Sequence, residues 1–238
     1  MKLTEIKKED KIILVEKCKE LLNLKDAKLP DEYYYSSLPL CVIDSIFSIN
    51  SNYTSVKNVI KRYCTYFNIN PLRESSSFPS TSNQLSVKSF IDSYEKIGVD
   101  FYTQKIFNNR QRTSAVNGIL KSEAVYEFCK VLNKYNINYF QDVKNIYGNK
   151  EFEKDIRNIK GQGKGVSLLY FLMLSGEEDK IKPDRMIIRF LEEILQRKIN
   201  IDESQILLKE ASVVLSKEYP NLSPRLLDYT IWEYTRGN

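Results

Sequence analysis

The most informative stretch of this chain is a glycine-rich segment, Ile159-Lys160-Gly161-Gln162-Gly163-Lys164-Gly165. The segments on both sides have apolar residues at helical spacing, so the sequence predicts a tight turn between two helices. Free N–H groups at the start of the second helix would favour an anion, and Lys160 and Lys164 add positive charge beside them. A connection that needs glycine only to turn tightly would show the same pattern.

A single acidic residue follows the turn at a distance of about twenty residues, in Lys182-Pro183-Asp184. Asp184 is expected at the start of the next helix, where the helix N-terminus and the neighbouring Lys182 or Arg185 favour its charged form. As an N-cap it would contribute about 1 kcal/mol of stability. The carboxylate would also be available for chemistry, and both roles remain open at this stage.

The rest of the chain also has helical rather than strand-like periodicity, so we expect an all-α protein. We predict helices over residues 11–22, 40–49, 53–67, 84–97, 114–135, 139–147 and 225–234, and a loop over the Ser- and Pro-rich residues 71–83. Asp202 and Gln205 suggest a capping box, and Ser223-Pro224 predicts a capped helix start.

Composition excludes several kinds of chemistry. The 238 residues contain no histidine, which rules out Ser-His-Asp and Cys-His nucleophile systems and argues against a catalytic zinc or iron site. The net charge of +5 permits a nucleic-acid partner without requiring one. Acid–base catalysis would therefore fall to Asp, Glu, Lys, Tyr or Cys.

The four cysteines are scattered through apolar segments, at Cys18, Cys41, Cys64 and Cys129. This spacing predicts buried free thiols and a reducing compartment. No apolar run has the length of a membrane span, and residues 1–10 lack the apolar core of a signal peptide. We therefore expect a cytoplasmic protein with no membrane partner.

The order of turn, apolar helix, short loop and Pro-Asp resembles the helix-hairpin-helix (HhH-GPD) DNA glycosylase superfamily, in its endonuclease III and adenine-glycosylase group. That family carries Leu-Pro-Gly-Val-Gly-x-Lys-Thr-Ala and then Val-Asp-Thr-His-x-x-Arg, and the matching runs here are residues 159–167 and 182–189. Residues 46–52 look like the family's Leu-Leu-Ser-x-Gln-x-Thr segment, with Asn50 in the duplex-probing place. The resemblance covers about 35 residues well and extends loosely over residues 40–238.

This resemblance implies a two-lobed helical fold and an activity. The first lobe would be a helical barrel over residues 36–170, and residues 1–35 with 171–238 would form the second. The implied enzyme is a monomer that acts on double-stranded DNA in base excision repair, where it hydrolyses the N-glycosidic bond of a damaged or modified base. Asp184 would be the catalytic residue, and Lys160, Gly161, Gln162, Gly163, Lys164 and Gly165 would hold the DNA backbone.

Several departures from the family pattern refine this expectation. Gly165 stands where bifunctional members carry the lysine that cleaves the strand, which predicts a hydrolase without lyase activity unless the adjacent Lys164 takes that role. The family's four-cysteine loop is missing, so no iron–sulfur cluster and no required cofactor is expected. The resemblance still implies a monovalent cation at the backbone carbonyls of Ile159 and Gly161. Arg185 and Met186 replace the residues after the acid, which leaves the substrate open.

Further DNA contacts are expected outside the hairpin. Asn50, Asn52, Tyr53 and Asp44 are candidates for probing the duplex or lining a base pocket. Arg110, Arg112 and Lys57 are candidates for phosphate contacts. For Lys57 a solvated helix face is the ordinary alternative, and Asp44 inside an apolar helix would need a partner if buried.

Two other functions remain open at this stage. The chain would be a non-catalytic helix-hairpin-helix DNA-binding protein if the altered residues around Asp184 have removed the chemistry. It would be a helical protein-interaction domain if the hairpin is only a connection. DNA binding at low salt separates the last reading from the other two.

Overall fold

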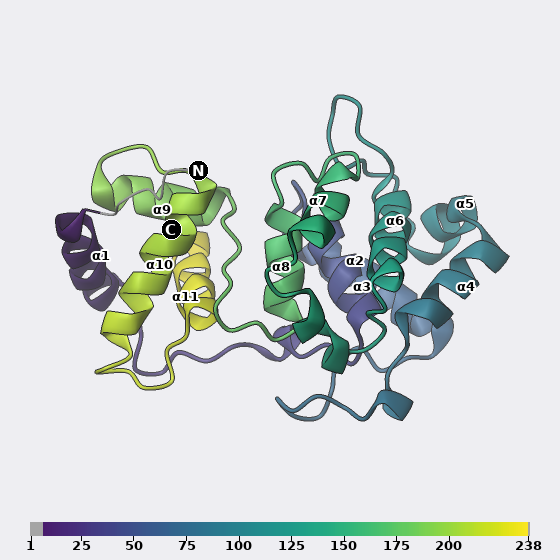
Figure 1. Cartoon of the computed structure of the whole chain (residues 1–238), viewed down its shortest axis with the longest axis horizontal. Helices are drawn as coiled ribbons and strands as arrows, with labels where there is room; N and C mark the ends of the chain where they lie inside the picture. The colour runs from purple at the N-terminus through teal and green to yellow at the C-terminus, as the bar shows by residue number, and fades with distance from the viewer. Residues whose placement is uncertain (1–6, 238) are drawn as a thin grey trace. The chain divides into compact units, whose positions relative to one another are not determined.

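The computed structural model describes residues 7–237, and within this range the protein is all-helical and has no β-strand beyond two isolated bridges (Figure 1). The chain divides into two compact units. The continuous unit comprises residues 31–176, and the split unit combines the residues before 31 with those from 177 onward. These limits fall a few residues away from the expected limits at residues 36 and 170.

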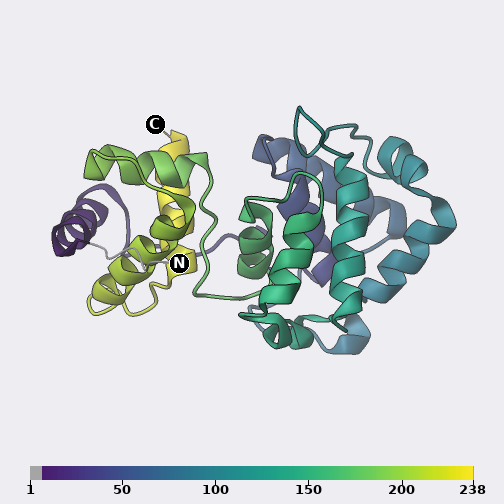
Figure 2. The same ribbon diagram turned by 45° about the horizontal axis from the view of Figure 1, so that its top comes forward.

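The continuous unit is built around α2 (Leu38–Phe47), and all ten residues of this helix are buried. It packs against α3 (Tyr53–Phe67), α6 (Lys121–Lys134) and α8 (Val166–Leu174), and both views show it inside the unit (Figures 1 and 2). A helix that is apolar nearly all round can only be stable when other helices enclose it. The helix expected over residues 40–49 is therefore confirmed for residues 40–47.

The remaining elements complete this unit. α4 (Val87–Ile97) packs on α6, and α7 (Lys150–Asn158) precedes α8. Between α3 and α4, the Ser- and Pro-rich segment is largely irregular, as expected. The shorter elements are η1 (Asp31–Tyr33), η2 (Thr81–Asn83), α5 (Val99–Phe101), the π-helix η3 (Tyr102–Ile106) and the 3₁₀-helix η4 (Phe140–Ile146).

The helix expected over residues 114–135 begins well after its predicted start. Apolar spacing suggested a helix from Ser114, but α6 begins at Lys121 and the residues before it form a loop that projects from the unit (Figure 1). Asn117 has a φ of +56°, and a Cβ at Gly118 would lie 2.4 Å from the Ser114 backbone. The loop is thus folded tightly on itself in a conformation that a helix cannot contain.

The split unit contains α1 (Lys8–Leu21), α9 (Arg185–Leu195), α10 (Ile201–Leu215) and α11 (Pro224–Gly237). Its core includes buried Leu14, Ile187, Leu191 and Leu227, with further apolar residues from all four helices. Its helices pack chiefly as α1 on α9 and α10, and α11 on α9 and α10.

The caps of the split unit test two predictions. Ser223 Oγ accepts the amide of Leu226 at 3.2 Å, which confirms the capped start of α11. The expected capping box at Asp202 is wrong, because Asn200 caps α10 by accepting the Glu203 amide at 2.9 Å. Asn200, two residues before Asp202, thus provides the side-chain acceptor for a free N–H in the first turn of the helix.

The four cysteines are free and buried, as expected. Burial raises the pKa of the Cys18 and Cys64 thiols to about 12, so neither is a reactive thiolate at neutral pH. Across residues 7–237, every helix is too short or too polar to cross a membrane.

Candidate nucleic-acid interface

The turn between α7 and α8 is fixed by a threonine from another part of the chain. Gly161 has a φ of +88°, and a Cβ there would lie 2.3 Å from Thr113 Oγ1. The same hydroxyl donates to the carbonyl of Lys160 at 2.9 Å and accepts the Ile119 amide at 3.2 Å. Glycine is therefore required at position 161 both by the backbone conformation and by the close approach of Thr113.

The last glycine of the turn is held by an arginine. Gly165 has a φ of +72° and precedes α8, and a Cβ there would lie 2.6 Å from the Arg157 guanidinium carbon. Arg157 Nη1 also donates to the carbonyl of Gly163 at 3.2 Å. Arg157 was not among the expected site residues, and it fills the space that a side chain at position 165 would need.

The middle of the turn separates into buried and exposed residues. Gln162 is only 2% exposed. Its side-chain Oε1 accepts a hydrogen bond from the Ser167 hydroxyl, and its backbone N–H donates to the carbonyl of Ile159 at 2.9 Å. Its side chain therefore supports the turn from inside and is not available to DNA, unlike the exposed Lys160 and Lys164.

Free amides remain at this turn. Among the described residues, none accepts a hydrogen bond from the amides of Gly163 and Lys164. The first amides of α8 point in the same sense because of helix geometry. This end of the hairpin therefore offers donors and positive charge to an anion.

The turn between α2 and α3 presents Asn50. This residue is exposed and has a φ of +49°, a left-handed conformation that non-glycine residues seldom adopt. Asn52 caps α3 by accepting the Ser55 amide at 2.8 Å, so its side-chain oxygen already has a structural role. Tyr53 begins α3, is half-buried and lies 5.4 Å beneath the Lys57 ammonium.

The loop before α6 carries the two candidate arginines. Arg110 is exposed, and Arg112 Nε donates to the carbonyl of Gly118 at 2.9 Å. Val116, at the far part of this loop, is 77% exposed and is the most exposed large apolar residue among those described. An exposed apolar side chain between basic residues is unusual for a solvated loop.

Hydrogen bonds join these three segments. Gln111 Oε1 accepts the Ser51 hydroxyl at 2.7 Å and the Lys121 ammonium at 3.0 Å, and Thr113 reaches Lys160 as described above. The structure thus brings together residues 48–52, 109–118 and 159–165, which we call the loop face. Gln111, Thr113 and Lys121 make these connections, and no local sequence signal marked them as partners.

Asp44 does not lie on the loop face. It is fully buried and accepts hydrogen bonds from Tyr35 at 2.8 Å, Ser48 at 2.8 Å and Tyr170 at 3.3 Å. Burial raises the pKa of the two phenols, and the nearby Asp44 carboxylate raises it further. These contacts fit the structural alternative for Asp44, a buried acid paired with hydroxyl donors.

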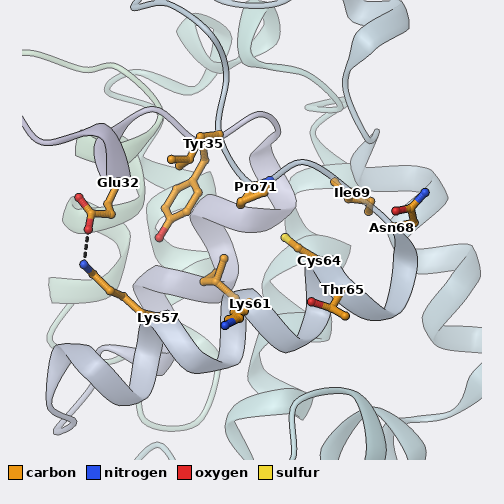
Figure 3. A pocket seen from close by; sticks show the side chains of 11 residues that line it. Glu32, Tyr35, Lys57, Lys61, Cys64, Thr65, Asn68, Ile69 and Pro71 are labelled. Atoms are coloured by element: carbon orange, nitrogen blue, oxygen red, sulfur yellow. Dashed lines mark ion pairs between the residues drawn. The ribbon is translucent and has the colours of Figure 1, made fainter.

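Lys57 lies at a cavity rather than on the loop face (Figure 3). It forms an ion pair with Glu32 at the edge of a cavity of about 450 Å³. The other lining residues come from one side of α3 and the segments around it, and they are Tyr35, Ile60, Lys61, Cys64, Thr65, Asn68, Ile69, Pro71 and Leu72. Lys57 and Lys61 are the two cations among these lining residues, and Lys57 is paired with Glu32.

In the split unit, Asp184 is the N-cap of α9. Its Oδ1 accepts the amides of Met186 at 2.8 Å and Ile187 at 3.2 Å, which confirms the capping role. The side chain is half-buried, and no described residue forms a hydrogen bond to Oδ2. One carboxylate oxygen is therefore held by the helix while the other remains available.

A second acid accompanies Asp184. Asp228 on α11 is 2% exposed, and its Oδ1 accepts the Lys182 amide at 3.0 Å. Burial raises the pKa of Asp228 well above its ordinary value, and the negative charge of Asp184 raises it further. Sequence patterns did not indicate this second carboxyl group, because Asp228 lies more than forty residues from Asp184 in the chain.

Comparison with known proteins places the chain in a family. It belongs to the family described as a domain of unknown function, DUF8548, whose model matches residues 12–236. No curated protein and no solved structure matches the chain. The family description names no activity, so the function is argued from the geometry of the two units.

Proposed function

We propose that this protein is a monofunctional DNA glycosylase, which hydrolyses the N-glycosidic bond of a damaged or modified base without cutting the strand. The observation that carries the proposal is the loop face, where Gln111 accepts a hydrogen bond from Ser51 and Thr113 donates one to Lys160, so that three segments suggested separately by the sequence are joined. Two of the segments carry exposed cations and the third carries an exposed asparagine.

The chemistry of the loop face suits a duplex. Free amides at the start of α8, together with Lys160 and Lys164, would bind backbone phosphates. Arg110 adds charge from the neighbouring loop, while Asn50 and Val116 would contact the bases or the sugar edges. Such a surface combines hydrogen-bond donors for phosphates with one exposed polar and one exposed apolar side chain. An enzyme needs this combination to hold DNA while it exposes one base.

Asp184 is the proposed catalytic residue. As the base leaves with the electron pair of the N-glycosidic bond, the sugar gains positive charge, which a carboxylate at this point would stabilise. Water then adds to C1′ and transfers its proton to the carboxylate. The helix N-terminus holds Asp184 through Oδ1, which leaves Oδ2 for this work.

The absence of lyase activity rests on position 165. Gly165 has no amine, and the guanidinium of Arg157 occupies the adjacent space. Lys164 is exposed on the same turn and is the residue that would supply an amine if strand cleavage were observed. No step depends on the monovalent cation, and the Ile159 carbonyl proposed to bind it already accepts the Gln162 amide.

The second candidate is a DNA-binding protein without catalysis. The observation that favours it is the capping role of Asp184, because this role alone would explain an acid at that position. The loop face would then hold DNA for another purpose.

A base-release assay separates these candidates. Wild-type protein is incubated with duplexes that carry a panel of alkylated, oxidised, deaminated and modified bases, and each sample is read with and without hot alkali. Breaks that require alkali are expected, with Asp184→Asn as the control for a contaminating glycosylase. Breaks without alkali would contradict the monofunctional proposal. Salt-sensitive binding without base release would support the second candidate, and no binding at low salt would contradict both.

A further inference from the structure

Lys121 is the first residue of α6, and its side chain is almost wholly buried, with 1% exposed. Its four hydrogen-bond partners are all neutral oxygens. The Nζ atom lies 3.0 Å from Phe47 O, 2.5 Å from Ile49 O, 2.8 Å from Ser51 Oγ and 3.0 Å from Gln111 Oε1. Burial lowers the pKa of Lys121 to about 8, which leaves the ammonium charged at neutral pH.

This arrangement has the chemistry of a monovalent-cation site. A cation of low charge is held in a protein by carbonyl, hydroxyl and amide oxygens, and here the same ligands surround an ammonium group. An ammonium has three N–H donors for these four oxygens, so its positive charge as well as its hydrogen bonds holds them together. Lys121 thus supplies a built-in cation between two loops.

The loops that it joins are those of the loop face. Phe47 and Ile49 precede Asn50 and Ser51 follows it, and Asn50 itself has a left-handed backbone conformation with a φ of +49°. Gln111 belongs to the loop that carries the two candidate arginines. Because the Phe47 and Ile49 carbonyls before Asn50 and the Ser51 hydroxyl after it all meet the ammonium, the turn cannot relax without breaking these bonds.

We propose that Lys121 is a positioning residue, which holds the Asn50 turn against the Gln111 loop so that the loop face is preformed before DNA arrives. Its role in DNA binding rests on the proposed function. Its role in ordering the two loops does not, and the two roles are measured separately.

The loop-ordering role is tested by hydrogen exchange without DNA. Lys121→Ala leaves an oxygen-lined gap, and exchange is expected to accelerate in peptides that cover residues 47–52 and 109–113, but not in those from α4. Methylammonium or ethylammonium chloride should slow exchange again by occupying the gap, whereas tetramethylammonium chloride at equal ionic strength should not. Unchanged exchange in the folded variant, or equal rescue by all three salts, would overturn the proposal.

The control and the second variant keep the result clear. Lys130→Ala removes an exposed lysine from the same helix, whose partner is Glu127, and should leave exchange in both loops unchanged. Gln111→Ala removes one of the four oxygens and should loosen the same peptides to a smaller extent. If Lys121→Ala does not fold, Gln111→Ala and Lys121→Met carry the test, and loops as protected as in the wild type would again overturn it.

The DNA arm then uses duplex binding. At fixed salt, Lys121→Ala is expected to bind duplex about tenfold more weakly, in line with the loss of hydrogen bonds to a charged group, and ethylammonium should restore part of the affinity. Full affinity in a variant with loosened loops would overturn the preformed-surface role. A wild-type protein that binds no duplex would contradict the proposed function alone, since the exchange experiment stands without it.

Discussion

The loop face and the N-terminus of α9 are held in opposite ways. On the loop face, three segments far apart in the chain are tied by side chains such as Gln111, Thr113 and Lys121. At α9, Asp184 is held by two amides of its own helix. The first arrangement depends on the whole continuous unit, whereas the second depends on a few consecutive residues.

Under the proposed function, this difference separates the residues that bind DNA from the residue that performs the chemistry. A surface that must match a duplex benefits from rigid cross-connections, because a small shift in one loop weakens all the contacts. A single carboxylate needs only a fixed direction and a charge, which a helix N-terminus supplies. Substitutions in the loop face should therefore alter binding, and substitutions at α9 should alter turnover.

The largest expected effect is on base release by Asp184→Asn. Asparagine is as good an N-cap as aspartate, so the free energy of unfolding should change by less than about 1 kcal/mol. Base release should fall by about 10²–10⁴-fold, because the charge that stabilises the sugar is lost. Single-turnover kinetics and urea unfolding measure the two quantities. Full turnover in the folded variant would remove Asp184 from the mechanism.

Gly161→Ala tests the cross-connection at the hairpin. The new methyl group would meet Thr113 and would require a positive φ, so unfolding free energy should fall by about 2–4 kcal/mol, with weaker duplex binding. Gly163→Ala is the matched control, because nothing lies within 4 Å of its Cβ position. Equal effects at the two glycines would mean that the Thr113 contact does not fix the turn.

Asp228→Asn tests whether burial beside Asp184 raises the pKa of Asp228. The pKa of Asp228 is higher in the folded protein than in the unfolded chain, so its contribution to stability is full below about pH 4 and is lost as pH rises toward the raised value. Asparagine does not titrate, so the variant does not lose this stability. The unfolding free energy of the variant relative to wild type should therefore rise by about 1.4 kcal/mol for each pH unit of increase within that window. Urea unfolding between pH 4 and pH 8 measures it, with exposed Asp202→Asn as the control. A difference that does not vary with pH would refute the raised pKa of Asp228.

The smallest expected effect concerns two lysines. Lys164→Gln should reduce the slope of log affinity against log salt by about one, as expected for the loss of one phosphate contact. Lys57→Gln should leave the slope unchanged, because Lys57 pairs with Glu32 beside the cavity. The opposite result, a change only for Lys57, would place the DNA on the α3 side of the unit.

Local patterns allowed much of the fold to be predicted from the sequence. The apolar run of α2, the spacing of α3 and the Ser-Pro start of α11 each contain their own signal. The start of α6 was mispredicted because apolar spacing continues through residues 114–120, although Asn117 adopts a left-handed backbone there. The structural roles of Asp44 and Lys57 could not be predicted in this way. Asp44 is hydrogen-bonded to Tyr170 and Lys57 is paired with Glu32, and local spacing connects neither pair.

The candidate site shows the same limit. Asp184 as a cap was predictable because the adjacent residues of α9 decide it, and the turn was predictable from its glycine pattern, although the contact of Gly161 with Thr113 was not. Lys121 and Asp228 were not predictable, since each is defined by contacts with segments far away in the chain. A buried lysine at a helix start looks in sequence like any exposed one.

The central claim is that three separate segments form one DNA-binding surface. Hydrogen exchange of the wild-type protein with and without a duplex, at low salt, tests it most directly. We predict that the duplex protects residues 47–52, 109–118 and 159–166 together, and leaves residues 57–72 around the cavity unchanged. Protection confined to the cavity segment, or no protection in any of the three segments while DNA is bound, would contradict the account.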